Sequence, residues 1–284
     1  MKETDRLKAE LLTLAKYGSA LAVLSWDQEV NLPPKAHHIR GEVSALLAAD
    51  LHRRATDAKL IRLARSLAKP GVFDNLSPDE QVIVRETLRD LERAQKLPVE
   101  FVEEFTKLTA HAFSAWADAR QKSDFSIFNP KLKKIVEMSR RQAEYLGYED
   151  SPYDALLDTY EPGMTAKQLD AVLLPLADEL KGLVSRVKDK PQPALPKRKY
   201  PLESQKRLNR TISEDIGYDF GAGRIDASPH PFTTNFHPTD VRITTRYDED
   251  DFWVSLGSVI HEAGHALYEQ GLPEKMFGTP LGES

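Results

Sequence analysis

Apolar residues recur three and four positions apart along most of the chain, a spacing that predicts amphipathic helices. The first predicted helix covers residues 2–25 and is interrupted near Gly18, and a long helix over 35–68 follows the break at Pro33 and Pro34. Later helices are predicted from residues typical of helix ends. Helix starts are indicated by a capping box at Ser77 and Glu80, by Pro98, by Asn129 with Pro130, and by a capping box at Thr165 and Gln168. Gly147 indicates a helix end.

The C-terminal third of the chain changes character. Residues 191–201 are rich in proline and lysine and predict an exposed loop, which a short helix over 201–216 follows. Helical periodicity then fades over 217–240, and the alternation in 240–247 predicts a strand. A last helix is predicted over 250–270. The expected fold class is mostly α, with a small sheet beside that last helix, in a single domain over 1–284.

The composition narrows the classes of function. Hydrophobic residues make up 40% and charged residues 29%, which is ordinary for a globular protein. The net charge of −5 gives no basic surface for nucleic acid. No apolar stretch approaches the roughly 18 residues of a membrane span, and the N-terminus lacks the apolar segment of a signal peptide, so a cytoplasmic protein without a membrane partner is expected. There is no cysteine, so any metal must be held by His, Asp or Glu.

The last predicted helix contains His261-Glu262-Ala263-Gly264-His265, which has the form H-E-x-x-H. Residues four apart lie on one face of a helix, so the imidazoles of His261 and His265 can bind one Zn²⁺. Glu262 projects beside the metal and can accept a proton from a water molecule that the metal makes more acidic. His261 and His265 are therefore predicted metal ligands, and Glu262 is the predicted general base that passes the proton to the leaving amine.

The motif alone leaves a structural alternative open, in which two histidines pack at a helix contact beside an exposed glutamate. The apolar surroundings favour a metal, because burying two imidazoles and a carboxylate without a partner is unfavourable. A catalytic zinc of this type usually has a third protein ligand. Glu269, Glu274 and Glu283 are the carboxylates that follow His265, and none of them stands at a comfortable spacing for that role.

Several segments beyond the zinc motif resemble the carboxypeptidase Taq family of thermostable zinc metallocarboxypeptidases. Three ordered motifs carry the resemblance, and two upstream segments add to it. The three motifs are His230-Pro231-Phe232, similar to the family's H-P-F motif; the segment 240–247, similar to its D-x-R-x-T motif; and the segment 264–273 around its H-E-x-G-H motif. The two upstream segments are 160–165 and 26–29.

The resemblance implies a large helical fold with a deep central groove, a homodimer, and a hydrolase that releases single C-terminal amino acids from peptides. It implies zinc as the metal, with cobalt as an effective substitute. The family's third zinc ligand is a Glu in an H-E-S-Q motif, and its position would fall beyond Ser284. The chain is therefore expected to be a C-terminally truncated metallopeptidase domain.

Three further residues are candidates for substrate binding. His230 is expected to line the active-site groove, the alternative being a histidine in an exposed loop. Asp240 and Arg242 could bind or orient the substrate, or they could form a structural ion pair on a strand. Two rival functions stay open: another zinc endo- or aminopeptidase of the H-E-x-x-H group, and a catalytically silent helical fragment that binds its missing C-terminal half or another partner.

Overall fold

A computed structural model of the protein describes residues 2–191, 196 and 198–283. The chain divides into two compact units. The first combines Met1–Leu132 with Lys199–Ser284, and the second is Lys133–Arg198. The residues predicted to form an exposed loop over 191–201 include 192–195 and 197, which lie outside the described residues.

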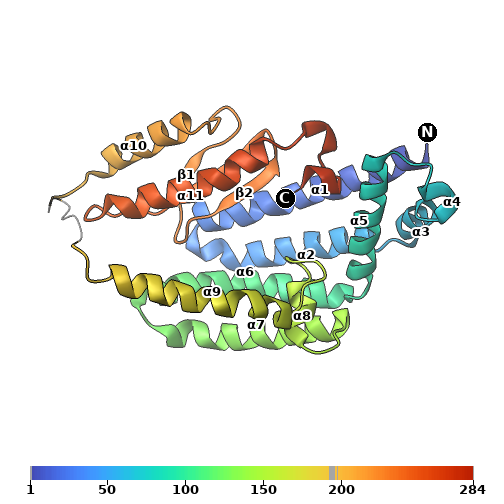
Figure 1. Ribbon diagram of the computed structural model, residues 1–284, viewed down its shortest axis with the longest axis horizontal. Helices are drawn as coiled ribbons and strands as arrows, with labels where there is room; N and C mark the ends of the chain where they lie inside the picture. Colours follow the sequence, from blue (N-terminus) through green and yellow to red (C-terminus); the bar gives the residue numbers. More distant parts are fainter. Residues whose placement is uncertain (1, 192–195, 197, 284) are drawn as a thin grey trace. The chain divides into compact units, whose positions relative to one another are not determined.

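The described residues form mostly helices and one small sheet, as predicted (Figure 1). The elements in chain order are α1 (Glu3–Val30), η1 (Pro34–Ala36), α2 (His37–Ala55), α3 (Ala58–Leu67), α4 (Pro70–Phe73), α5 (Pro78–Gln95), α6 (Val99–Lys122), α7 (Phe125–Leu146), α8 (Pro152–Leu157), α9 (Ala166–Val187), α10 (Leu202–Asp215), β1 (Ile225–Ala227), β2 (Thr233–His237), β3 (Asp240–Thr245), α11 (Phe252–Gln270), η2 (Glu274–Met276) and η3 (Pro280–Gly282).

Most of the predicted end signals act as expected. Ser77 and Glu80 form a reciprocal capping box at the start of α5, and Thr165 and Gln168 form another at the start of α9. Gly147 has a φ of 80° and donates its N–H to the carbonyl of Ala143 at 2.9 Å, which ends α7. The predicted strand is confirmed as β3, and the last two predicted helices are confirmed as α10 and α11.

The prediction of a single helix over 35–68 is wrong. The structure has a 3-10 turn followed by α2 and α3, separated at Thr56 and Asp57. The Asp57 carboxylate accepts the backbone N–H of Lys59 at 2.7 Å, so it caps α3 and stops α2 from continuing. Aspartates are common in charged amphipathic helices. Asp57 therefore did not mark a helix end in the sequence, and the regular apolar spacing predicted one continuous helix.

Two other predicted helix boundaries also differ. α1 continues through Gly18 without a break, because its packing outweighs the modest cost of one glycine in a helix. α7 begins at Phe125 rather than at Pro130, which lies inside the helix. Asp124 accepts the backbone N–H and the hydroxyl of Ser126 at 3.0 and 2.6 Å, so the chain is already turned into the helix before the proline.

The first unit contains two apolar clusters of buried residues. One joins α1, α3 and α5 and has fully buried leucine, isoleucine and valine side chains. The other joins the sheet to α11. The first cluster consists of Leu7, Leu11, Leu60, Ile61, Ala64, Leu67, Ile83, Val84 and Leu91.

The three strands pair in the order β1-β3-β2. β3 is central, parallel to β1 and antiparallel to β2, and Ile243 pairs with both Ile225 and Thr233. The pairing of β2 with β3 is irregular between Asn235 and His237. The hydroxyl of Ser19 on α1 donates to the carbonyl of Phe236 at 2.6 Å, so β2 is tied to α1 as well as to β3.

The second unit contains α8, α9 and the greater part of α7. Ser151 caps α8 by accepting the backbone N–H of Tyr153 at 3.2 Å. The carboxylate of Asp154 accepts the backbone N–H of Ala166 at 2.7 Å, which joins the first turn of α8 to the start of α9. These polar contacts fix the α8–α9 connection within the unit.

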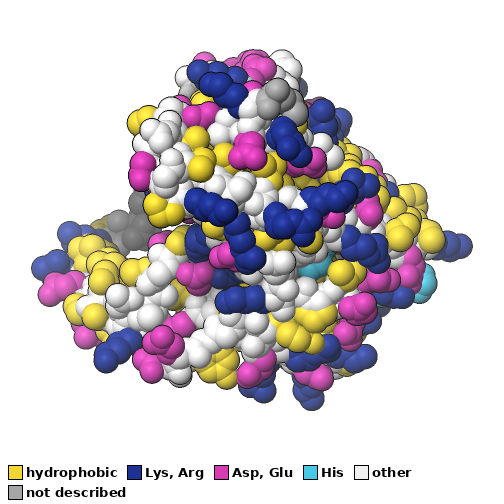
Figure 2. Space-filling view, turned by 90° about the vertical axis from the view of Figure 1, so that its right-hand side faces the viewer, with side chains coloured by type: hydrophobic (Ala, Val, Ile, Leu, Met, Phe, Trp, Pro, Cys, Tyr) yellow, Lys and Arg dark blue, Asp and Glu magenta, His cyan; other side chains and the backbone are white. Residues whose placement is uncertain are grey.

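Acidic and basic side chains lie among one another on the face of the molecule that Figure 2 shows. Elsewhere along the chain, ion pairs such as Lys122 with Asp118 and Lys206 with Glu203 join neighbouring turns of one helix. None of the helices in the part of the chain that the structure describes combines the length and the apolar composition of a membrane span.

Glu29, near the end of α1, makes the stability of the chain depend on pH. Burial raises the pKa of its carboxyl from 4.5 to about 7. The folded state therefore binds this proton more tightly than the unfolded state, and the resulting stability is full below about pH 4.5 and lost as pH rises through about 7. We expect Glu29→Gln to stabilise the chain at pH 8 by about 1–2 kcal/mol, allowing for partial exposure of the side chain.

Urea unfolding at pH 4.5 and pH 8 measures this difference. Glu10→Gln is the matched control, because Glu10 is exposed on the same helix and its replacement should change little at either pH. Equal stability of the Glu29→Gln and unaltered chains at pH 8 would show that the Glu29 carboxylate is ionised without penalty.

Candidate metal centre

The packing of one side of α11 against the sheet determines which side of the helix, and therefore which residues, face solvent. Val259, Ala263 and Ala266 are fully buried and pack against the sheet. These positions share one side of the helix, so His261 and His265 lie on the opposite, exposed side. The packing of α11 thus presents both imidazoles to solvent from one rigid element.

The two imidazoles face each other across one turn of α11. Their Nε2 atoms are 3.3 Å apart, and the ring planes are inclined at 81°. Two ligands that bind one Zn²⁺ at about 2.05 Å with a tetrahedral angle lie about 3.4 Å apart. His261 and His265 therefore fit a common metal ion without rearrangement of the helix.

Glu262 lies on the side of α11 that faces the sheet and is only 7% exposed. The hydroxyl of Thr233 on β2 lies 2.8 Å from the carboxylate oxygen Oε2 of Glu262 and 2.8 Å from its backbone carbonyl. The hydroxyl proton is shared between these two acceptors, so Thr233 holds the Glu262 carboxylate in one orientation. A carboxylate that is held in one orientation at the position next to His261 can act as a base.

Glu269 lies two turns beyond Glu262 on the same helix. The side-chain amide of Asn235 on β2 donates a short hydrogen bond to the Glu269 carboxylate. This carboxylate therefore already has a partner on the sheet. Within the described ranges, the only three ligand-type side chains whose donor atoms lie within 4.8 Å of one another are elsewhere, on α2 and α6.

Asp240 and Arg242 are two residues apart on β3 and form a bidentate ion pair. Nε and a terminal nitrogen of Arg242 each lie 2.8 Å from a carboxylate oxygen of Asp240. The Arg242 guanidinium also lies 4.4 Å from the centre of the Trp26 ring. These contacts support the interpretation of Asp240 and Arg242 as a structural ion pair. Each of the two charged groups has its partner within the protein.

His230 lies in the connection before β2, with an exposed side chain. Its backbone carbonyl accepts the hydroxyl of Ser228, whose oxygen also lies 2.7 Å from the hydroxyl oxygen of Thr244. Its ring makes no hydrogen bond or ion pair to any residue that the structure describes. The local backbone is therefore fixed, while the imidazole is available to solvent.

Thr233 and Asn235 were not singled out from the sequence, although both contact acidic residues of α11. They follow the H-P-F segment in the order Thr233-Thr234-Asn235, which reads as an ordinary polar strand. The alternation places both side chains on one face of β2. Their partners could be recognised only after the sheet and α11 were packed together.

Residues 6–284 match the sequence profile of the family described as Carboxypeptidase Taq (M32) metallopeptidase, and the chain belongs to this family. It is 37% identical to Carboxypeptidase 1 of Bacillus subtilis (strain 168) over 276 residues, which cover 96% of this chain and 55% of that protein. It is 40% identical to Thermostable carboxypeptidase 1 of Thermus thermophilus, over 93% of this chain and 54% of that protein. The chain spans about half the length of the curated relatives it matches.

Solved structures show the same relation. The crystal structure of BsuCP superposes with a TM-score of 0.95 at 36% identity and covers 100% of this chain and 57% of that chain. The M32 carboxypeptidase from Deinococcus radiodurans R1 gives a TM-score of 0.86 at 36% identity, with the same coverage. The fold of the described residues is thus that of the corresponding part of this family.

Proposed function

We propose that this chain carries the metal-binding helix of a metallocarboxypeptidase that releases single C-terminal amino acids from peptides. The observation that carries the proposal is the 3.3 Å separation of the Nε2 atoms of His261 and His265, on the helix that also holds the buried Glu262. The names of the relatives, which are carboxypeptidases, support the choice of reaction.

His261 and His265 would hold the metal ion, with zinc as the first candidate and cobalt as the second. A bound divalent ion supplies Lewis acidity, which makes water more acidic and polarises a carbonyl group. Glu262 accepts the proton of the attacking water on its carboxylate and returns it to the nitrogen of the leaving amino acid. Thr233 keeps that carboxylate from rotating while the proton is transferred.

We place the other predicted features within the same proposal. Residues 1–284 would act as one metallopeptidase domain built from both compact units. His230 would contact the peptide through its exposed ring, and Asp240 and Arg242 would shape the site as a pair. A homodimer is proposed on the family resemblance, and a cytoplasmic location is proposed with it.

The chain incubated with zinc and defined peptides tests the reaction. N-blocked dipeptides and longer N-blocked peptides should lose one C-terminal residue, and the same peptides with C-terminal amides should remain intact. Internal cleavage would favour an endopeptidase, and release of N-terminal residues from unblocked peptides would favour an aminopeptidase. A chain that neither retains zinc nor hydrolyses any of these peptides would support the helical-fragment hypothesis.

Thr233→Val is expected to lower kcat about 10-fold with little change in KM or in zinc content. The valine removes a hydrogen bond to an ionised carboxylate, and such bonds contribute about 1.5–3 kcal/mol. Thr233→Ser keeps the hydroxyl and should retain near-normal kcat. If valine and serine at this position behave alike, the hydroxyl does not orient Glu262.

A further inference from the structure

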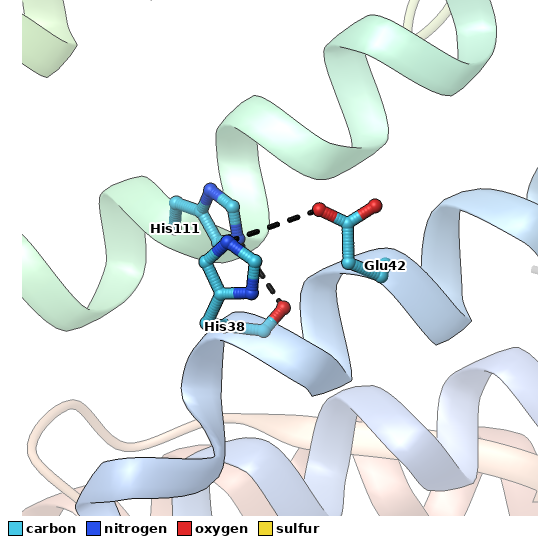
Figure 3. A group of neighbouring side chains, drawn as sticks. All are labelled: His38, Glu42 and His111. Carbon is cyan, nitrogen blue, oxygen red and sulfur yellow. Dashed lines mark hydrogen bonds and ion pairs between the residues drawn. The ribbon is translucent and has the colours of Figure 1, made fainter.

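Three side chains that could bind a metal ion lie together where α2 packs against α6 (Figure 3). His38 and Glu42 are one turn apart on α2, and His111 comes from α6. Each of the three offers one donor atom, and these atoms lie within 4.8 Å of one another. Nothing in the H-E-x-x-H motif accounts for this cluster.

The position of His111 depends on a glycine in the facing helix. A Cβ atom added to Gly41 would lie 2.7 Å from Nε2 and 2.9 Å from Cδ2 of His111. Only glycine therefore lets the imidazole lie against the backbone of α2, beside the His38–Glu42 pair. The rings of His38 and His111 are stacked, with centroids 5.1 Å apart and planes inclined at 24°.

Lys107 currently satisfies the charge of the cluster. It lies one turn before His111 on α6, and its ammonium forms an ion pair with the Glu42 carboxylate. The Nε2 atom of His38 lies 3.9 Å from the same carboxylate oxygen. A cation bound by the cluster would take the place of the ammonium group, so Lys107 competes with it.

We propose that His38, Glu42 and His111 form a second divalent-metal site that links α2 to α6. Two imidazoles and one carboxylate suit Zn²⁺, Co²⁺, Ni²⁺ or Cu²⁺, whereas Mg²⁺ and Ca²⁺ prefer oxygen ligands alone. Small rotations of the side chains would bring the donors to bonding distance, because His38 is exposed and Glu42 is partly exposed. The remaining coordination positions would be filled by water.

His111 also lines a cavity of about 870 Å³. Pro34, His37, Arg120, Pro229 and Arg246 are among its other lining residues, and all belong to the first unit. The cavity gives solvent access to His111. Because the ion links two helices of the folded state and would be lost on unfolding, its binding should stabilise the first unit.

The test uses the full chain with His261→Ala and His265→Ala, which removes the other histidine pair and keeps the result independent of the proposed function. Isothermal titration with zinc chloride at pH 7.5 should show one bound equivalent. His111→Ala and His38→Ala in this background should each weaken the affinity at least about 10-fold. Thermal unfolding without metal checks that His111→Ala is folded, and the exposed His38 gives a variant that should not disturb packing.

Lys107→Met is the discriminating variant. It removes the competing ammonium and should raise the zinc affinity about 3- to 10-fold, although it deletes a contact of Glu42. His237→Ala is the matched control for loss of a histidine elsewhere in the first unit and should leave the affinity unchanged. The proposal is overturned if the background chain binds no zinc, if His38→Ala and His111→Ala bind as tightly as the background, or if Lys107→Met weakens binding.

Discussion

Replacing Glu262 with glutamine is expected to lower kcat for an N-blocked dipeptide about 10²–10⁴-fold, the usual contribution of general acid–base catalysis. The amide has nearly the same shape as the carboxylate but cannot accept a proton at neutral pH. It still accepts the hydroxyl of Thr233 through its oxygen, so the local structure should persist. Steady-state kinetics with zinc measured on the same samples would check the result.

Zinc content separates the chemical role of Glu262 from a structural role. Because the metal ligands are His261 and His265, the glutamine variant should keep the zinc stoichiometry of the unaltered chain. Glu274→Gln is the control, since that carboxylate is exposed just beyond the end of α11. A Glu262→Gln chain that retains both zinc and full kcat would remove Glu262 from the mechanism.

Gly223→Ala should destabilise the chain by about 3 kcal/mol or more. A Cβ atom here would overlap the Tyr218 hydroxyl and the backbone carbonyl of Val241, and it would lie 2.8 Å from Cζ of Tyr218. The Tyr218 hydroxyl donates to the Val241 carbonyl at 2.7 Å within the cluster that supports α11. The alanine must therefore push the segment before β1 away from β3 or break this bond.

Thermal unfolding followed by circular dichroism should show a lower Tm for Gly223→Ala, by about 5–10 °C. Gly18→Ala is the matched control, because a Cβ atom at Gly18 meets nothing within 4 Å and the residue lies inside α1. That variant should be more stable by about 0.5–1 kcal/mol. If both alanines change stability alike, the close approach at Gly223 is relieved at little cost.

The sequence was sufficient to predict those features of the helices that depend only on residues close together in the chain. The Ser77–Glu80 pair, the αL glycine Gly147 and the spacing of His261 and His265 each depend on residues within one or two turns, and the structure places the elements accordingly. The boundary at Asp57 was also local, but apolar periodicity outweighed it in the prediction. At Asp57 the capping carboxylate, and not the apolar period, decides where the helix ends.

The part of the site that could not be predicted depends on packing between distant segments. Thr233 and Glu262 are separated by 28 intervening residues and meet only because β2 and α11 lie side by side. For Asp240 and Arg242, the two-residue spacing on a strand is equally compatible with substrate binding and with a structural ion pair. The sequence does not show which residues pack against this pair, so it cannot distinguish the two roles.

The contacts from Thr233 to Glu262 and from Asn235 to Glu269 have a joint mechanical consequence. Two attachment points on one strand fix both the rotation of α11 about its axis and its translation along it. A slip of one residue in β2 would turn both polar side chains to the other face of the sheet and release both carboxylates together. Any redesign that transfers this helix to another scaffold must therefore carry the strand with it, in unchanged register.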